Sequence, residues 1–173
     1  MALASRYGER PLVDELPESF VLTSVKKNGF DFYVAADELP ETRRNGHTLL
    51  SDTDRGWFQI DENFGFTAAV VEFLLQSFGN TVRLLPCLPS AWARGKACGL
   101  RVPGDVTVDI VWENGALAYA NSHTGKRFAE DRPFTLKLIG TKTVCCWKAD
   151  TVYRVTWDAA AGKALIREVA SNE

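Results

Sequence analysis

The sequence predicts a mainly β protein of the α+β class, in which an antiparallel β-sandwich-like C-terminal half packs on one buried helix. Short runs of alternating apolar and polar residues, separated by turn residues, recur from about residue 81 to residue 169. One long apolar segment, over about 67–78, is the strongest helix signal in the chain. These two patterns together predict the fold class.

The clearest strand covers 106–112, where apolar residues alternate with polar ones, and Glu113-Asn114-Gly115 predicts the turn after it. Regular short strands with turns between them favour a β-sandwich. The other predicted strands cover 81–85, 116–120, 134–139, 143–148, 151–157 and 163–169. Tyr119, Trp147, Tyr153 and Trp157 are expected mostly in the core, although one of them could stack on a sugar ring.

The helix over 67–78 is expected to begin at Thr67 as its N-cap and to stop at Gly79-Asn80. Its apolar stripe is so wide that most of its circumference should be buried.

The N-terminal segment, 1–50, is predicted to contain a β-hairpin with strands over 20–25 and 30–34, joined by the Asn-Gly turn 26–29. The helix and a Pro-rich connection fill 51–95, and a small antiparallel sandwich fills 96–173. We expect the three segments to form one compact unit.

Composition and charge exclude several classes of partner and cofactor from the expected functions. The chain has 173 residues, 46% of them hydrophobic, and a net charge of −2 with both signs interspersed, so neither nucleic acid nor a membrane surface is an expected partner. No apolar run approaches the roughly 20 residues of a membrane span. The N-terminus lacks a signal-peptide core, which favours a cytoplasmic protein. With two histidines and four cysteines without Cys-x-x-Cys spacing, we expect no metal and no cofactor.

Residues 57–65 place polar groups between aromatic residues just before the predicted helix. We call Trp57, Phe58 and Phe64 the aromatic frame. Asp61 there is open to two interpretations: a turn or capping residue, or a general base whose protonation the aromatic surroundings tune. His123 lies on an expected loop tip, 121–126, where a histidine suits acid–base chemistry. The catalytic candidates are therefore Asp61, Glu62 and His123, and the substrate-binding candidates are Trp57, Asn63, Phe64 and Trp92.

Three blocks in this region are similar to glycoside hydrolase family 95, whose members are α-L-fucosidases and related α-L-galactosidases. They read Phe-Gln-Ile-Asp-Glu-Asn-Phe-Gly at 58–65, Glu-Phe-Leu-Leu-Gln-Ser at 72–77 and Leu-Leu-Pro-Cys-Leu-Pro-Ser-Ala-Trp at 84–92. The likeness continues through 99–101 and 108–112; it covers about 57–120 well and the rest of the chain weakly.

The resemblance implies an inverting hydrolase built on an (α/α)6 barrel, of which this region would be the last stretch, followed by a small β domain. It implies that Asp61 activates the attacking water with help from asparagine. The general acid and the paired asparagines are expected upstream, in barrel helices that this sequence does not include. Glu62 departs from the family pattern, in which a small residue is usual. Asp61 and Glu62 would also point to opposite sides of an extended segment, which makes them a poor catalytic pair.

Three functions stay open at this point. The first is a carbohydrate-active protein derived from an α-L-fucosidase-like hydrolase and not self-sufficient in hydrolysis. The second is a repurposed isomerase or cyclase that acts on a small apolar molecule by acid–base catalysis, in a pocket between helix and sandwich. The third is a non-catalytic ligand-binding or interaction module. The expected partners are a small-molecule or sugar ligand and a second copy of the chain docked on the helix side.

Overall fold

The computed structural model of the chain describes residues 1–25, 32–33, 57–58, 60–129 and 133–169. Contacts divide the chain into two units, Met1–Val70 and Val71–Glu173. The three segments expected from the sequence, and their assembly into one compact unit, stay predictions.

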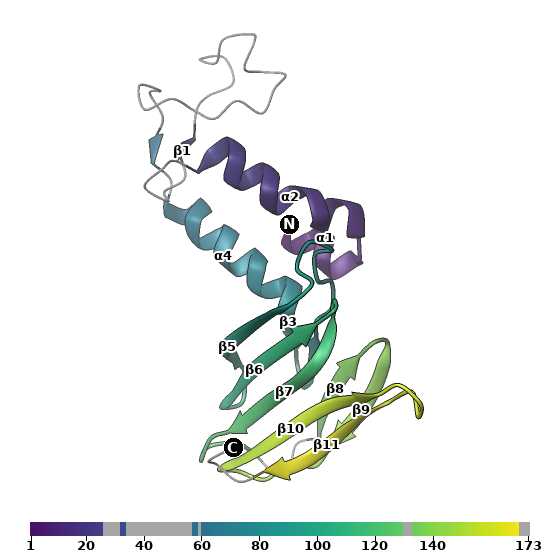
Figure 1. The fold of residues 1–173 in the computed structure, drawn as a ribbon. Helices are drawn as coiled ribbons and strands as arrows, with labels where there is room; N and C mark the ends of the chain where they lie inside the picture. The colour runs from purple at the N-terminus through teal and green to yellow at the C-terminus, as the bar shows by residue number, and fades with distance from the viewer. Residues whose placement is uncertain (26–31, 34–56, 59, 130–132, 170–173) are drawn as a thin grey trace. The chain divides into compact units, whose positions relative to one another are not determined.

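The first unit is helical (Figure 1). Helix α1 covers Ala2–Tyr7 and ends at Gly8, whose left-handed φ of 75° suits a glycine after a helix. Helix α2 covers Arg10–Ser24, with a proline in its first turn where no main-chain donor is needed. Strand β1 (Phe32–Tyr33) pairs antiparallel with β2 (Trp57–Phe58).

The predicted hairpin over 20–34 is wrong. The first of its two strands, 20–25, is helical up to Ser24, and the second pairs with β2 instead. The run Phe-Val-Leu-Thr-Ser-Val has a high β propensity, which a tertiary contact overrides: the ring of Phe20 stacks on that of Phe66, with centroids 4.6 Å apart and planes 13° apart. The predicted turn, 26–29, lies outside the described residues.

Helix α4 covers Ile60–Leu74, so the prediction of a helix over 67–78 is wrong at both ends. Thr67 is not an N-cap but a residue of the helix interior, where its hydroxyl donates a hydrogen bond to the carbonyl oxygen of Asn63, 3.0 Å away. Residues 75–78 form a strand because they pair with 81–84, and Gly79-Asn80 turns that hairpin instead of ending a helix.

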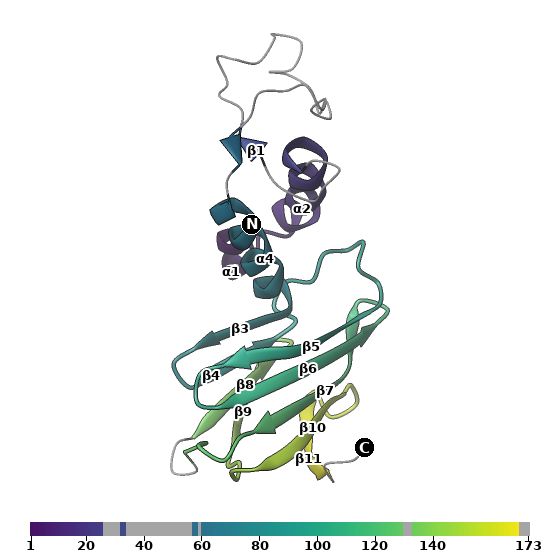
Figure 2. The same ribbon diagram turned by 90° about the vertical axis from the view of Figure 1, so that its left-hand side faces the viewer.

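The second unit is a β-sandwich of two facing sheets (Figure 2). A five-stranded antiparallel sheet has the order β11-β10-β7-β6-β5, and a four-stranded sheet has the order β3-β4-β8-β9. Every pairing is antiparallel except that of β4 with β8. The strands are β3 (Leu75–Phe78), β4 (Thr81–Leu84), β5 (Gly95–Val102), β6 (Val106–Glu113), β7 (Ala116–Thr124), β8 (Phe134–Leu138), β9 (Thr141–Cys145), β10 (Thr151–Asp158) and β11 (Lys163–Val169).

The mainly β class and the sandwich are confirmed, and most predicted strands are present with bounds shifted by a few residues. The sandwich also takes in β3 and β4, which precede the segment 96–173 expected to hold it. No strand was predicted over 95–102. A register shift between Ala97 and Leu100 interrupts the alternation there, so the sequence pattern is broken although the strand continues.

The core lies between the sheets, where alternate residues of β6 are almost fully buried and face buried residues of β4 and β8. Phe134, Trp147 and Tyr153 form a stack, with successive ring centroids 4.3 and 5.1 Å apart. Leu74, in the last turn of α4, also belongs to this core. The core therefore includes the end of α4 as well as the two sheets.

Candidate functional site

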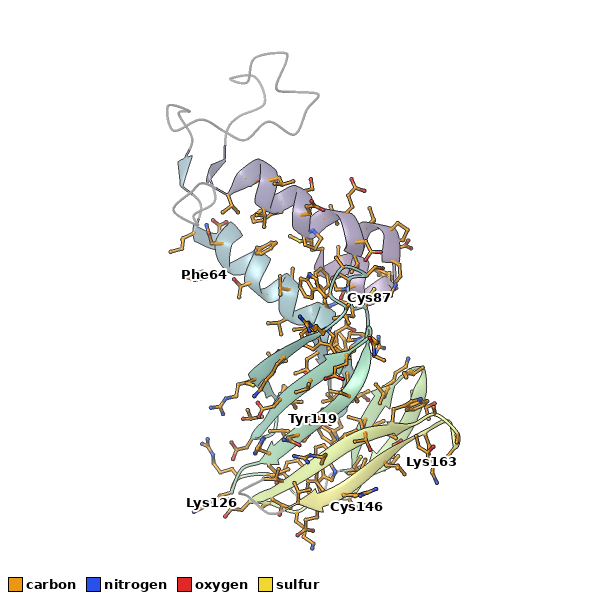
Figure 3. All side chains as sticks on the ribbon, in the orientation of Figure 1. Phe64, Cys87, Tyr119, Lys126, Cys146 and Lys163 are labelled. Carbon is orange, nitrogen blue, oxygen red and sulfur yellow. The ribbon has the colours of Figure 1, made fainter. Side chains whose placement is uncertain are left out.

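Four of the predicted site residues belong to the start of α4: Asp61, Glu62, Asn63 and Phe64. Asp61 is exposed and makes no hydrogen bond or ion pair with another described residue. Phe64 is 67% exposed and is labelled on the helix in Figure 3. The side chains of Trp57, Phe58 and Glu62 lie outside the described part of the chain, so the expected aromatic frame remains a prediction.

The extended geometry expected for Asp61 and Glu62 is wrong, because both residues belong to the first turn of α4. Successive residues of a helix are about 100° apart around its axis, since each turn takes 3.6 residues. Asp61 therefore sits where the helix dipole stabilises a carboxylate. This position agrees with the structural interpretation of Asp61 and leaves its carboxylate open to solvent.

Trp92 lies in the second unit, in the connection from β4 to β5. Its half-buried ring packs edge-on against Phe73, with centroids 6.0 Å apart and planes at 65°. Its carbonyl oxygen accepts a hydrogen bond from Nε1 of Trp112 at 2.9 Å. These contacts anchor the connection to the core, and substrate binding by Trp92 stays a prediction.

His123 does not lie on a loop tip, as predicted, but within strand β7. The strand continues through 121–124 because it pairs there with both β6 and β10. The His123 side chain is 43% exposed, and its Nε2 lies 3.3 Å from Oδ2 of Asp109, an ion pair whenever the imidazole is protonated. Oδ1 of Asp109 accepts a hydrogen bond from the main-chain nitrogen of Gly99 at 2.7 Å.

A second polar pair that the sequence did not predict joins β7 and β10 on the same face of the sheet. Nε of Arg154 donates a hydrogen bond to Oδ1 of Asn121 at 3.0 Å. The guanidinium carbon of Arg154 lies 5.0 Å from the ring centroid of Tyr119. Burial alternates along this part of β7: Ala120, Ser122 and Thr124 are buried, so Tyr119, Asn121 and His123 lie on the solvent-facing side. Which of these side chains contact one another depends on the register between β6, β7 and β10, which the sequence does not specify.

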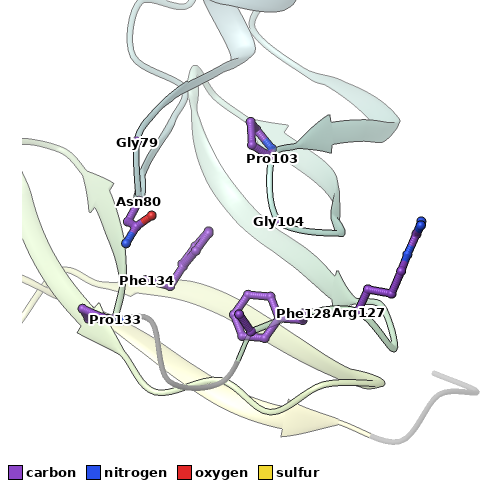
Figure 4. A pocket seen from close by; sticks show the side chains of 9 residues that line it. Gly79, Asn80, Pro103, Gly104, Arg127, Phe128, Pro133 and Phe134 are labelled. Atoms are coloured by element: carbon purple, nitrogen blue, oxygen red, sulfur yellow. The ribbon is translucent and has the colours of Figure 1, made fainter.

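One end of the sandwich holds a cavity of about 400 Å³ (Figure 4). Its walls come from the turns that follow β3 and β5 and from the segment between β7 and β8. Arg127 lies at its rim: its main-chain nitrogen donates a hydrogen bond to Oδ2 of Asp105 at 3.1 Å, while its side chain is 90% exposed. The lining residues are Gly79, Asn80, Pro103, Gly104, Arg127, Phe128, Ala129, Pro133 and Phe134, so neither Asp61 nor His123 contributes to this cavity.

Within the described part of the chain, no group of three or more His, Cys, Asp or Glu side chains is arranged to hold a metal ion. No helix there is long and apolar enough to cross a membrane. Cys145 is buried and Cys146 exposed, as expected for neighbours at the end of a strand. Burial raises the pKa of the Cys145 thiol from 9.0 to about 11.

Comparison with known proteins agrees with the resemblance seen in the sequence. Residues 76–166 match the sequence model described as glycoside hydrolase family 95, C-terminal domain. Alpha-L-fucosidase 2 of Arabidopsis thaliana is 54% identical over 61 residues, which cover 35% of this chain and 7% of that protein. Probable alpha-fucosidase A of Aspergillus oryzae is 34% identical over 116 residues, which cover 60% of this chain and 16% of that protein.

The corresponding protein of Aspergillus niger is 30% identical over 114 residues, 59% of this chain and 14% of its own length. The chain thus spans less than a fifth of the length of these relatives. Its sandwich lies almost entirely within the matched residues. The chain belongs to glycoside hydrolase family 95 and carries the C-terminal domain of that family.

Proposed function

We propose that this chain acts in carbohydrate hydrolysis as the C-terminal portion of an α-L-fucosidase-like enzyme and does not hydrolyse fucosides by itself. Its relatives are named as α-L-fucosidases or probable α-fucosidases, and each is several times longer than the part that the chain matches. The residues that complete a hydrolytic site would come from a further protein segment.

The observation that carries this proposal is the isolation of Asp61. Inverting hydrolysis uses two carboxyl groups about 6.5–9.5 Å apart, on opposite sides of the scissile bond. Asp61 is exposed and has no ion-pair or hydrogen-bond partner among the described residues. In the described part of the chain, Asp61 therefore has neither the enclosing walls nor the second polar group that an acid–base site needs.

In the completed site Asp61 would be the general base. Its carboxylate would take a proton from a water molecule, and that water would attack the anomeric carbon from the face opposite the leaving group. A general acid from the other segment would protonate the leaving oxygen as the glycosidic bond breaks. The exposed ring of Phe64 lies in the same stretch of α4 and would offer an apolar surface to the sugar.

Complementation tests this proposal. The chain would be co-expressed with the Aspergillus oryzae relative from which the matched C-terminal portion has been removed, and the product assayed on an aryl α-L-fucoside. We expect hydrolysis only when both parts are present, and its loss in Asp61→Asn by at least about a hundredfold, the usual scale for an acid–base group. Glu113→Gln removes one negative charge from an exposed hairpin position and serves as the control. Full activity with Asp61→Asn contradicts the assignment of the base.

We also propose a second function, ligand binding, which the cavity at the end of the sandwich favours. Its volume of about 400 Å³ lies in the range of small-molecule sites, and Phe128, Phe134 and two prolines give it largely apolar walls. Asn80 and Arg127 supply polar groups at its edge. Because neither acid–base candidate lines this cavity, it supports a binding module more than an isomerase or cyclase.

Fluorescence of an anilinonaphthalene sulfonate probe tests this second function. We expect saturable binding of one probe per chain, displaced by small apolar molecules and blocked by Asn80→Trp, which places a large side chain at the cavity. Lys142→Trp adds the same ring at an exposed position on β9, outside the cavity, and should leave binding unchanged. Equal binding by the chain and by Asn80→Trp contradicts a role for the cavity.

A further inference from the structure

We propose that the outer face of the five-stranded sheet binds a saccharide that carries a carboxylate, with Arg154 as the main anchor. Four polar residues occupy paired positions on neighbouring strands: Asp109 opposite Asn121, Asn121 opposite Arg154, and Arg154 opposite Arg167. Directly paired residues point to the same side of a sheet, so these side chains form one continuous row. Strands β6, β7, β10 and β11 carry it (Figure 1).

The row faces away from the core. The residues that precede and follow it along β6, β7 and β10 are buried between the sheets: Val108 and Ile110, Ala120 and Ser122, Tyr153 and Val155. Side chains alternate between the faces of a strand, which places the row on the solvent side. Its members are half-buried or exposed, so a ligand can reach them.

Two contacts within the sheet fix the position of the Arg154 guanidinium. Its Nε is bonded to Asn121, and its guanidinium lies over the ring of Tyr119, a residue labelled on this sheet in Figure 3. Among the described residues, no group forms a hydrogen bond with its two terminal nitrogens. A guanidinium that is already fixed in place loses little freedom on binding, and its fork matches the two oxygens of a carboxylate.

The position of Arg167 is a second observation that supports an anion site. It stands directly opposite Arg154, and like charges in opposite positions destabilise a pair of strands. Neither arginine has an ion-pair partner among the described residues. The carboxylate in the row, that of Asp109, lies on the far side of Asn121 and is engaged by His123 and Gly99. An anionic group bound between the arginines would offset this repulsion.

The rest of the row suits the hydroxyl groups of a sugar. Asp109 offers acceptors, and Asn121 offers both donors and acceptors. A row of carboxylate, amide and two guanidinium groups complements a uronic acid, which has several hydroxyls and one carboxylate. That the anion belongs to a saccharide rests on the carbohydrate-related function proposed above. A purely structural role for Arg154, stacked on Tyr119, would leave the placement of Arg167 unexplained.

Affinity electrophoresis of the full 173-residue chain tests the proposal. Native gels would contain polygalacturonate, a neutral xyloglucan or dextran sulfate at equal mass. We expect polygalacturonate to retard the chain, and Arg154→Gln to weaken this retardation about tenfold, as the loss of one charge-assisted contact implies. Arg167→Gln should weaken it several-fold. Arg101→Gln makes the same change in charge on β5, at the other edge of the sheet, and should retain it.

Three results would overturn the proposal: no retardation by polygalacturonate, equal losses in Arg101→Gln and Arg154→Gln, or stronger retardation by dextran sulfate, which would indicate general anion binding. Circular dichroism checks that Arg154→Gln is folded. The exposed Arg167 provides a second variant that leaves the Tyr119 stack intact. Binding needs no hydrolytic activity, so this site and the proposed role in hydrolysis can fail separately.

Discussion

The ring of Trp112 lies directly against the α-carbon of Gly95, which is paired with it across β5 and β6. The same ring donates the hydrogen bond that holds the carbonyl of Trp92. A glycine is needed at 95 because a β-carbon there would occupy the space of the indole ring of Trp112. The backbone angle is not the reason, because the φ of Gly95 is outside the left-handed region. This packing joins the connection that follows β4 to the sandwich core.

Gly95→Ala should therefore destabilise the sandwich by about 1–3 kcal/mol, the usual cost of overpacking a core. Denaturant unfolding followed by tryptophan fluorescence measures this change. Trp112→Phe removes the ring atoms that the new methyl group would meet, so the double variant should lose less than the sum of the single variants. Strict additivity would show that the two residues do not compete for this space.

Gly65→Ala should have the opposite effect in helix α4. Gly65 is exposed, and no atom lies within 4 Å of the position that a β-carbon would take. Replacing a glycine in a helix interior by alanine typically adds about 0.5–1 kcal/mol. Far-ultraviolet circular dichroism during thermal unfolding tests this gain. A loss of helix signal in the variant would contradict the placement of Gly65 inside α4.

Tyr153→Phe should destabilise the protein by about 1–3 kcal/mol, because it leaves a main-chain donor of the loop after β9 without its partner. The Tyr153 hydroxyl accepts a hydrogen bond from the nitrogen of Lys148 at 2.9 Å, and the ring is buried. Tyr119→Phe is the matched control, since its hydroxyl bonds to no described residue. Similar losses in both variants, measured by urea unfolding, would contradict the importance of this bond.

The Cys145 thiol should react slowly with iodoacetamide, because burial raises its pKa to about 11 and so lowers its thiolate fraction. Exposed Cys98 and Cys146 should react first, as mass spectrometry of timed digests can show. The folded state holds this proton more tightly than the unfolded chain. The stability due to the neutral thiol is therefore complete below pH 9.0 and falls as the pH rises to about 11. Cys145→Ala should remove this part of the alkaline loss, and an unchanged pH profile would contradict the assignment.

The sandwich was predictable from the strands that alternate clearly: β6 buries every second residue, and the Asn-Gly turn that follows marks its end. The start of α4 was not predictable, since Ile60–Gly65 contains asparagine, phenylalanine and glycine, which have low helix propensity, and Thr67 looks like a cap in the sequence. Thr67 instead bonds to the preceding turn of the same helix.

The candidate sites also fall into those that local sequence patterns predict and those that only the fold reveals. Asp61 could be singled out because local motifs carry the family likeness. The contacts of His123 with Asp109 and of Arg154 with Asn121 depend on strand register between distant segments, which no local pattern specifies. The pairing of Arg154 with Arg167 became visible only through that register.

The most direct test of the proposed function is an assay of the purified chain alone on an aryl α-L-fucoside, with size-exclusion chromatography of the same sample. We predict a folded protein without turnover, because Asp61 has no catalytic partner among the described residues and the chain spans only 7–16% of the length of its relatives. Turnover by the chain that Asp61→Asn abolishes would contradict this prediction. It would mean that the chain, alone or as an oligomer, assembles a complete hydrolytic site.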